Sequence, residues 1–118
     1  MDDFRFEGLD IWNEGIEISD LLFDIADLAE KKRFYKFAEQ LRAAGMSITN
    51  NIAEGSGSFS NKEFAQFINF SRRSLFECAN ILHIYERRRI IESNVRIPIN
   101  LKLIHLSKKL TSFRRSLL

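Results

Sequence analysis

Apolar residues recur along most of the chain at alternating steps of three and four, which is the spacing of one face of an α-helix. Four such stretches are separated by short polar or glycine-containing breaks, and they predict helices at about residues 9–29, 34–54, 61–88 and 95–117. Short connections place successive helices antiparallel. We therefore expect an all-α protein in which residues 1–118 form one domain, an antiparallel up-down-up-down four-helix bundle.

The first helical stretch carries two apolar seams side by side. One seam runs from Ile11 to Ala29, and the second is shifted by one position, with an acidic stripe opposite both. Because one bundle core needs only one such face, the extra width indicates burial against another subunit. The second seam comprises Trp12, Ile16, Ser19, Phe23 and Ala26, and the acidic stripe comprises Asn13, Glu17, Asp20, Asp24 and Asp27.

Two helix starts carry recognisable signals. Ser60 and Glu63 have the spacing of a capping box, and Phe59 and Phe64 have that of a hydrophobic staple. In the fourth helix Pro98 is expected in the first turn, where a missing N–H does least harm. Ser93 or Asn94 is then the predicted cap of that helix.

A polar row lies beside the apolar stripe of the second predicted helix. Gln40, Ser47, Asn51 and Glu54 follow one another at steps of seven, four and three, so they share one side of the helix. The row has two readings: a ligand or partner site, and a hydrogen-bonded network that fixes helix pairing or oligomer geometry. We favour the second, at a helix or subunit interface.

Composition and cysteine usage narrow the class of protein. The length of 118 residues and a hydrophobic content of 45% suit one domain with a real core. A single cysteine excludes an internal disulfide framework. The acidic start lacks the order of a signal peptide, and no apolar run approaches the ~20 residues that span a bilayer. We expect a soluble, cytoplasmic protein that does not interact with membranes.

Charge is unevenly divided along the chain. Residues 1–60 hold six Lys/Arg against twelve Asp/Glu, and residues 61–118 hold twelve against four, so balances of −6 and +8 give the overall +2. This division suits a nucleic-acid surface or the pairing of acidic helices with basic ones, and we favour the second. The arginine clusters, which are the predicted nucleic-acid contacts, are Arg72, Arg73, Arg87, Arg88 and Arg89. Arginine binds phosphates as a bidentate donor, but cations also stabilise a helix C-terminus, and the sequence favours neither reading over the other.

Catalytic and metal-binding patterns are poorly represented. Neither His83 nor His105 follows a glutamate at the Glu-x-x-His spacing of a di-iron bundle, and one cysteine with two histidines does not make a zinc site. Cys78 has the spacing of a buried core residue. We predict no metal, no cofactor, no small-molecule substrate and no enzymatic activity. An enzyme would need Glu77, His83 and Tyr85 to converge in a pocket.

Several blocks occur together in a recognisable order. They are Phe6-Glu7-Gly8-Leu9-Asp10-Ile11-Trp12, Gln40-Leu41-Arg42-Ala43-Ala44, Ser47-Ile48, Asn51-Ile52-Ala53-Glu54-Gly55, Ser60-x-x-Glu63-Phe64 and Ser74-Leu75-x-Glu77. From about Phe4 to Leu117 the chain resembles the four-helix-bundle family that includes the 23S rRNA intervening-sequence proteins. Four positions depart from the family's usual residues, and they are Gly45, Thr49, Arg73 and Cys78. The usual residue at position 73 is glycine, which suggests a close helix contact there.

The resemblance implies a ring-like homopentamer of four-helix bundles. Some genes of the family lie inside ribosomal RNA intervening sequences. The fold is also similar to that of the accessory proteins of diversity-generating retroelements, which bind nucleic acid and a reverse transcriptase. The resemblance thus implies self-association and a scaffold or adaptor role near RNA, DNA or a reverse-transcriptase-like enzyme. A purely structural self-assembling module is the alternative.

Overall fold

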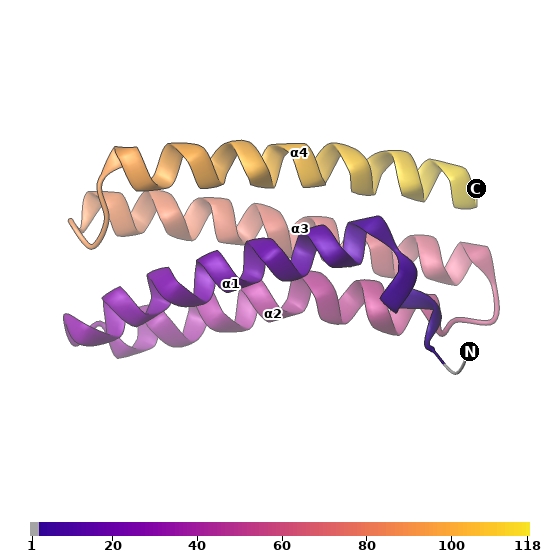
Figure 1. The fold of residues 1–118 in the computed structure, drawn as a ribbon, viewed down its shortest axis with the longest axis horizontal. Helices are drawn as coiled ribbons and strands as arrows, with labels where there is room; N and C mark the ends of the chain where they lie inside the picture. Colours follow the sequence, from indigo (N-terminus) through magenta and orange to yellow (C-terminus); the bar gives the residue numbers. More distant parts are fainter. Residues whose placement is uncertain (1–2) are drawn as a thin grey trace.

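The computed structural model describes residues 3–118 and folds them into one short 3-10 helix and four long α-helices (Figure 1). The short helix η1 (Arg5–Gly8) precedes α1 (Asp10–Lys31), α2 (Tyr35–Ser56), α3 (Asn61–Arg87) and α4 (Ser93–Leu117). The helices pack along one axis into an elongated body with extents of 44 × 26 × 21 Å. The predicted all-α four-helix bundle is confirmed, and each helix begins and ends within two residues of the predicted bounds.

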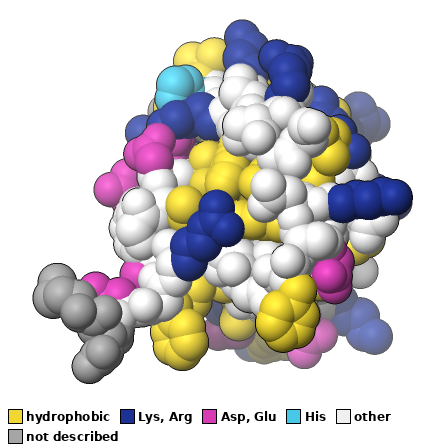
Figure 2. All heavy atoms as spheres, turned by 90° about the vertical axis from the view of Figure 1, so that its right-hand side faces the viewer, with side chains coloured by type: hydrophobic (Ala, Val, Ile, Leu, Met, Phe, Trp, Pro, Cys, Tyr) yellow, Lys and Arg dark blue, Asp and Glu magenta, His cyan; other side chains and the backbone are white. Residues whose placement is uncertain are grey.

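Each helix runs antiparallel to the next, as short connections require. α2 packs on both α1 and α3, and α3 also packs on α4, whereas α1 and α4 are the least closely packed neighbours. The α1–α2 and α3–α4 connections lie at one end of the bundle, and the α2–α3 connection lies at the other end with both chain termini (Figure 1). Seen from this second end, Lys and Arg side chains gather over the C-terminal end of α4 (Figure 2).

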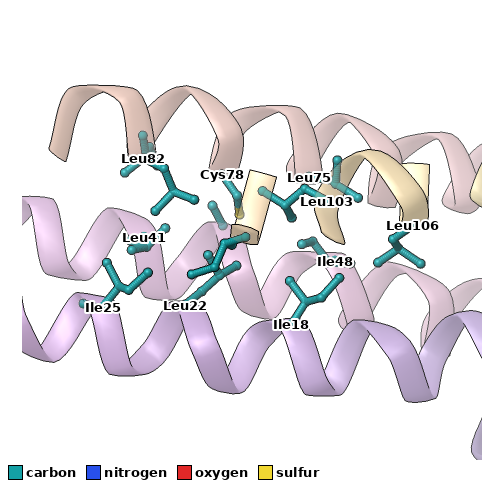
Figure 3. Close-up of a cluster of buried hydrophobic side chains, with 14 of the residues drawn as sticks. Ile18, Leu22, Ile25, Leu41, Ile48, Leu75, Cys78, Leu82, Leu103 and Leu106 are labelled. Carbon is teal, nitrogen blue, oxygen red and sulfur yellow. The ribbon is translucent and has the colours of Figure 1, made fainter. Parts of the chain in front are cut away.

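The core is a continuous column of aliphatic side chains supplied by all four helices (Figure 3). The fourth helix contributes Ile99, Leu103, Leu106 and Leu110 as buried residues, and Phe113 and Leu117 pack against the core. Burial of this apolar area from water is the main force that holds the helices together. Fully buried members from the four helices include Leu22, Leu41, Ile48, Cys78, Leu82, Leu103 and Leu106.

Hydroxyl groups from α1 and α3 set the position of α2. Ser19 donates to the Gly45 carbonyl at 3.0 Å, and Ser71 donates to the Ile48 carbonyl at 2.7 Å. The Tyr85 hydroxyl donates to the Phe37 carbonyl at 2.7 Å. A helical carbonyl has a second lone pair available for such a bond. These three buried donors therefore fix how α1 and α3 slide against α2 without interrupting its helix.

The start of α3 is confirmed in part. Ser60 caps the helix, because its hydroxyl accepts the Glu63 N–H at 3.1 Å. Within residues 3–118 the Glu63 side chain returns no bond to Ser60, so the capping box is incomplete. The staple prediction is wrong: Phe59 is 106% exposed, while Phe64 is buried and meets the Phe113 ring at 5.3 Å. Phe64 thus packs against Phe113 in the core and not against Phe59.

The start of α4 differs from the prediction. The helix begins at Ser93 with Glu92 as the cap residue, so Ser93 and Asn94 are already helical. Pro98 therefore lies in the second turn and not in the first. One helical hydrogen bond, to the carbonyl of Asn94, cannot form there. The proline is tolerated because Asn94 and Pro98 are exposed, so water can bond to the Asn94 carbonyl instead.

Most of the second apolar seam of α1 is covered within the chain. Ser19 and Ala26 are buried, with Ser19 bonded to α2, and the Trp12 ring lies 5.1 Å from that of Phe6 in the segment that forms η1. The width of the α1 face thus has an intramolecular explanation, although Ile16 remains 36% exposed. In the part of the chain that the structure describes, no helix combines the length and apolar character needed to cross a membrane.

Candidate interaction surfaces

The five arginines predicted to contact nucleic acid do not form one patch. Arg72 lines a cavity between α3 and α4, whereas Arg73 lies on the other side of α3, beside α2. The run from Arg87 to Arg89 lies at the far end of α3. At 1.5 Å per helical residue, about 22 Å separates Arg72 from Arg87 along the axis. Arg72 and the end of the bundle are therefore separate contact points.

The end of the bundle that carries the α1–α2 and α3–α4 connections is strongly basic. The arginine run of α3 meets a second cationic run, at the end of α1 and the start of α2. Lys32 donates from Nζ to the Arg89 carbonyl at 2.8 Å, across 57 residues of sequence. All the cations are exposed. We call this surface the basic end, and it comprises Lys31, Lys32, Arg33, Lys36, Arg87, Arg88 and Arg89.

Two turns of the same kind present these cations. Arg33 and Arg89 both have a left-handed backbone, with φ of 69° and 58°. In each turn the N–H of the residue after the arginine donates to a carbonyl of the preceding helix at 2.9 Å: Phe34 to Ala29, and Ile90 to Tyr85. This is the Schellman ending of a helix, in which glycine usually takes the left-handed position. Here arginine takes it at both turns, and the chain continues into the apolar Phe34 and Ile90.

Nearby carboxylates are already engaged by other arginines. Arg42 bonds Asp27 at 2.6 Å and Glu30 at 2.9 Å, and Arg96 bonds Glu86 at 2.9 Å. The hydrogen bonds to Asp27 and Glu30 raise the pKa of Arg42. Across residues 3–118 no carboxylate forms an ion pair with the seven cations, although Glu92 is exposed nearby. The basic end therefore carries positive charge that the subunit does not neutralise.

Half of the basic end was missed by reasoning from sequence. The run from Lys31 to Arg33 lies in the acidic half of the chain, so the charge balance of that half concealed it. The antiparallel topology could have revealed it, since it brings the end of the first helix beside the end of the third. The run from Lys31 to Arg33 would then have been predicted to lie beside the run from Arg87 to Arg89.

The predicted polar row divides into two parts. Asn51 donates from Nδ2 to the Ser47 carbonyl at 2.8 Å and to its hydroxyl at 3.0 Å, and Ser74 donates to the Ser47 hydroxyl at 2.8 Å. Ser47 and Asn51 thus belong to a network that joins α2 to α3. Gln40 and Glu54 are exposed and make no side-chain hydrogen bond within the described residues. The role of the row at a subunit interface stays a prediction.

Arg73 borders this network on the outer surface. It is exposed and lines a shallow depression with Phe70, Glu77 and the polar network. Arg73 therefore points to the surface of the subunit and not into the α2–α3 packing.

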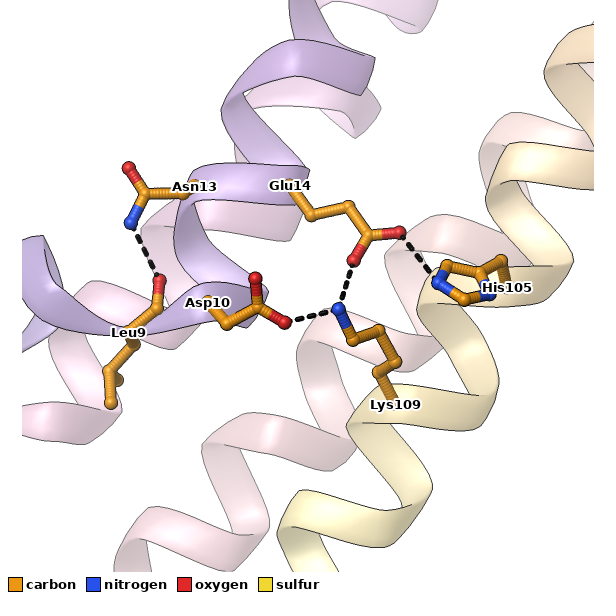
Figure 4. Close-up of polar contacts among 6 residues, drawn as sticks. All are labelled: Leu9, Asp10, Asn13, Glu14, His105 and Lys109. Atoms are coloured by element: carbon orange, nitrogen blue, oxygen red, sulfur yellow. Dashed lines mark hydrogen bonds and ion pairs between the residues drawn. The ribbon is translucent and has the colours of Figure 1, made fainter.

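A second polar cluster joins α1 to α4 (Figure 4). Lys109 bonds Glu14 at 2.8 Å and also pairs with Asp10, and His105 Nε2 lies 3.5 Å from Glu14 Oε1. The hydrogen bonds to Asp10 and Glu14 raise the pKa of Lys109 and so hold it in the charged form. The cluster borders a cavity of about 280 Å³ lined mainly by α1. Lys109 of α4 thus bridges two carboxylates of α1, an arrangement that ties the two helices together.

The residues considered for catalysis differ in burial. Cys78 is fully buried, and burial, with a smaller contribution from Glu77, raises the pKa of its thiol to about 12. Burial also raises the pKa of Tyr85 to about 12, and its hydroxyl is bonded to the Phe37 carbonyl. Glu77 and His83 are exposed. Among residues 3–118 no group of three or more His, Cys, Asp or Glu side chains is arranged to hold a metal ion.

Comparison with known proteins gives one result at the level of family. Residues 7–112 match the family described as 23S rRNA-intervening sequence protein, and this match covers α1 to α3 in full and most of α4. No protein of curated function matches the chain.

Proposed function

The chain belongs to the 23S rRNA-intervening sequence protein family, and we propose that it is a non-enzymatic helical scaffold that associates with RNA through its basic end. One observation carries the proposal. Two connections that are far apart in sequence gather seven exposed cations at one end of the bundle, and no ion pair within residues 3–118 neutralises them. A cationic surface of this kind attracts the phosphate backbone without regard to base sequence.

The distribution of charge supports end-on contact. The acidic residues of α1, such as Glu17, Asp20 and Asp24, are exposed along the side of the bundle. A nucleic-acid strand laid along that side would be repelled, whereas one that crosses the end meets lysines and arginines. Four of the seven cations are arginines, which can form bidentate bonds to phosphate oxygens. An adaptor of this kind leaves its sides free for a nucleic-acid enzyme, such as a reverse-transcriptase-like partner.

The proposal predicts RNA binding that weakens steeply with salt. We would measure fluorescence anisotropy of a labelled single-stranded RNA from about 50 to 200 mM salt, where each phosphate contact contributes a slope of about −0.7. Replacing Arg87, Arg88 and Arg89 together by glutamine should weaken binding at low salt and reduce the slope by about two units.

A matched control carries the same change in net charge elsewhere. Lys62, Lys102 and Lys108 are exposed and lie outside the basic end. Their joint replacement by glutamine should leave most of the affinity and the slope unchanged. Equal losses of RNA affinity in the two triple variants would mean that net charge alone, and not the basic end, explains the binding. No binding by the unaltered protein at low salt would rule out direct RNA contact.

The second candidate function is a self-assembling structural module, and the outer face of α4 favours it. Ile97, Leu101 and Ile104 follow one another on this face and are 48%, 61% and 42% exposed. Such a row of exposed apolar side chains suits contact between copies of the chain. A homopentamer is the assembly we propose. Native mass measurement at micromolar concentration tests it, and a monomer there would exclude the module.

A further inference from the structure

A second basic site lies in the groove between α3 and α4, away from the basic end. Arg72 of α3 and Arg114 and Arg115 from the last turn of α4 line one cavity of about 340 Å³. Asn69 and Thr111 complete the part of the lining that concerns the argument. The ion pairs of residues 3–118 include none of the three arginines. This groove opens near the end of the molecule where Lys and Arg side chains gather over α4 (Figure 2).

Arg72 is held in place but lacks a hydrogen-bond acceptor. Its guanidinium carbon lies 4.7 Å from the centroid of the Phe76 ring, an arrangement in which the ring face attracts the cation. Its Nε is buried and has no hydrogen-bond partner within the described residues. Buried polar hydrogens in native proteins are nearly always bonded. An acceptor that enters the groove would supply the missing partner.

The remaining polar groups of the groove also favour an acceptor-rich ligand. The Thr111 hydroxyl donates to the Ser107 carbonyl at 3.0 Å and is therefore occupied. Three guanidinium groups then dominate the lining, each a donor with no acceptor capacity. A phosphate group brings three or more oxygens and at least one negative charge, which matches several guanidinium forks better than a carboxylate does.

We propose that the α3–α4 groove binds one phosphate group through Arg72, Arg114 and Arg115. The site does not depend on the basic end, because about 22 Å of helix separates Arg72 from Arg87. It also does not depend on the exposed depression beside α2 that Arg73 lines. Loss of the RNA contact at the basic end would leave this site intact, so the two proposals fail separately.

The test is a titration of the full chain with inorganic phosphate, followed by nuclear magnetic resonance of the arginine Nε–H groups. Arg72 should show a large, saturable shift, and sodium chloride at equal ionic strength should not reproduce it. Arg72→Lys keeps the charge but removes the planar fork, so it should raise the dissociation constant about tenfold. Arg73→Lys is the matched control and should leave the constant unchanged.

A second variant guards against a folding defect at Arg72. Arg114 and Arg115 are exposed in the last turn of α4, so their joint replacement by glutamine should preserve the bundle while also weakening phosphate binding. Methyl phosphate and dimethyl phosphate then distinguish the source. Binding of both indicates a phosphodiester backbone, and binding of the monoester alone indicates a small phosphorylated ligand. Shifts that follow ionic strength only, or that survive in both arginine variants, would overturn the proposal.

Discussion

Arg33 and Arg89 adopt the left-handed backbone that a side chain disfavours, and both do so in turns of the same geometry. The left-handed conformation crowds the Cβ atom, and glycine avoids this penalty. Both residues belong to the basic end. The strain is therefore located where the proposed RNA contact needs a guanidinium, which is a common place for a stability–function conflict.

Replacing Arg89 by glycine should stabilise the fold by about 0.5–1 kcal/mol, because the strained φ of 58° costs glycine nothing. Urea unfolding measures the change. Arg88→Gly is the matched control, since Arg88 has a φ of −86° and gains nothing from glycine, so it should destabilise the protein slightly. Both variants should weaken RNA binding by similar factors. A loss of stability in Arg89→Gly would contradict the strain argument.

Cys78 should make stability fall at alkaline pH. Burial raises the pKa of its thiol from 9.0 to about 12, so between these values the unfolded chain has lost a proton that the folded chain retains. The contribution of this thiol to the free energy of unfolding is fully present below pH 9 and declines as pH rises toward 12. Between pH 9 and pH 10 the decline is about 1 kcal/mol for this residue alone.

The matched measurement compares urea unfolding of the unaltered chain with that of Cys78→Ala at these two pH values. The alanine variant is expected to be less stable overall, because it leaves a cavity. Its free energy of unfolding should nevertheless change less with pH, by about the amount given above. Parallel pH dependence in the two proteins would show that the thiol does not titrate differently on unfolding.

At the scale of the elements, two glycines of α2 should respond to alanine in opposite ways. A Cβ atom at Gly55 would lie 2.6 Å from the Phe67 Cβ and 2.8 Å from the Phe64 ring, so α2 and α3 would have to separate. At Gly45 the nearest atom would be a Leu22 methyl at 3.5 Å, an ordinary contact.

Gly55→Ala should therefore destabilise the bundle by about 1–3 kcal/mol through overpacking. Gly45→Ala should stabilise it by about 0.5–1 kcal/mol, since alanine restricts the unfolded chain and favours a helix interior. Thermal unfolding of the two variants measures the difference in sign. The same sign in both would mean that helix propensity, and not the approach of α3, determines the response.

Helix identity was predictable because apolar spacing is local, whereas the details of the helix starts were not. Ser60 caps α3 as predicted, since a cap depends on residues three positions apart. The staple failed because Phe64 has a better partner in Phe113, which is distant in sequence. Pro98 was placed in the first turn by propensity, yet Glu92 ends the connection early enough for Ser93 to begin α4.

At the scale of the whole molecule, the candidate sites depend on contacts between helices and so were only partly predictable. Each arginine cluster was visible in the sequence, but the groove site requires Arg72 of α3 to meet two arginines of α4. The basic end likewise requires Lys32 to reach Arg89. The polar row was found by its spacing, yet the partner that draws Ser47 and Asn51 into a network is Ser74, on another helix.

The seam between α1 and α4 should depend on one lysine more than on its neighbour. Lys109 bridges Asp10 and Glu14, while Lys108 is exposed and forms no ion pair with residues 3–118. Lys109→Gln leaves two carboxylates one helical turn apart without their shared cation, and like charges at that spacing repel. Lys108→Gln removes the same charge from an unpaired position.

Lys109→Gln should therefore lower the urea midpoint more than Lys108→Gln does. Hydrogen exchange should also accelerate in α4, because α4 packs less extensively on α1 than on α3 and its contact with α1 is the weaker one. The difference between the variants should shrink at about 0.5 M sodium chloride, because these charges are partly exposed and salt screens them. Equal midpoints at low salt would contradict the clamp. A difference that persists unchanged at high salt would instead assign the role of Lys109 to the packing of its aliphatic stem.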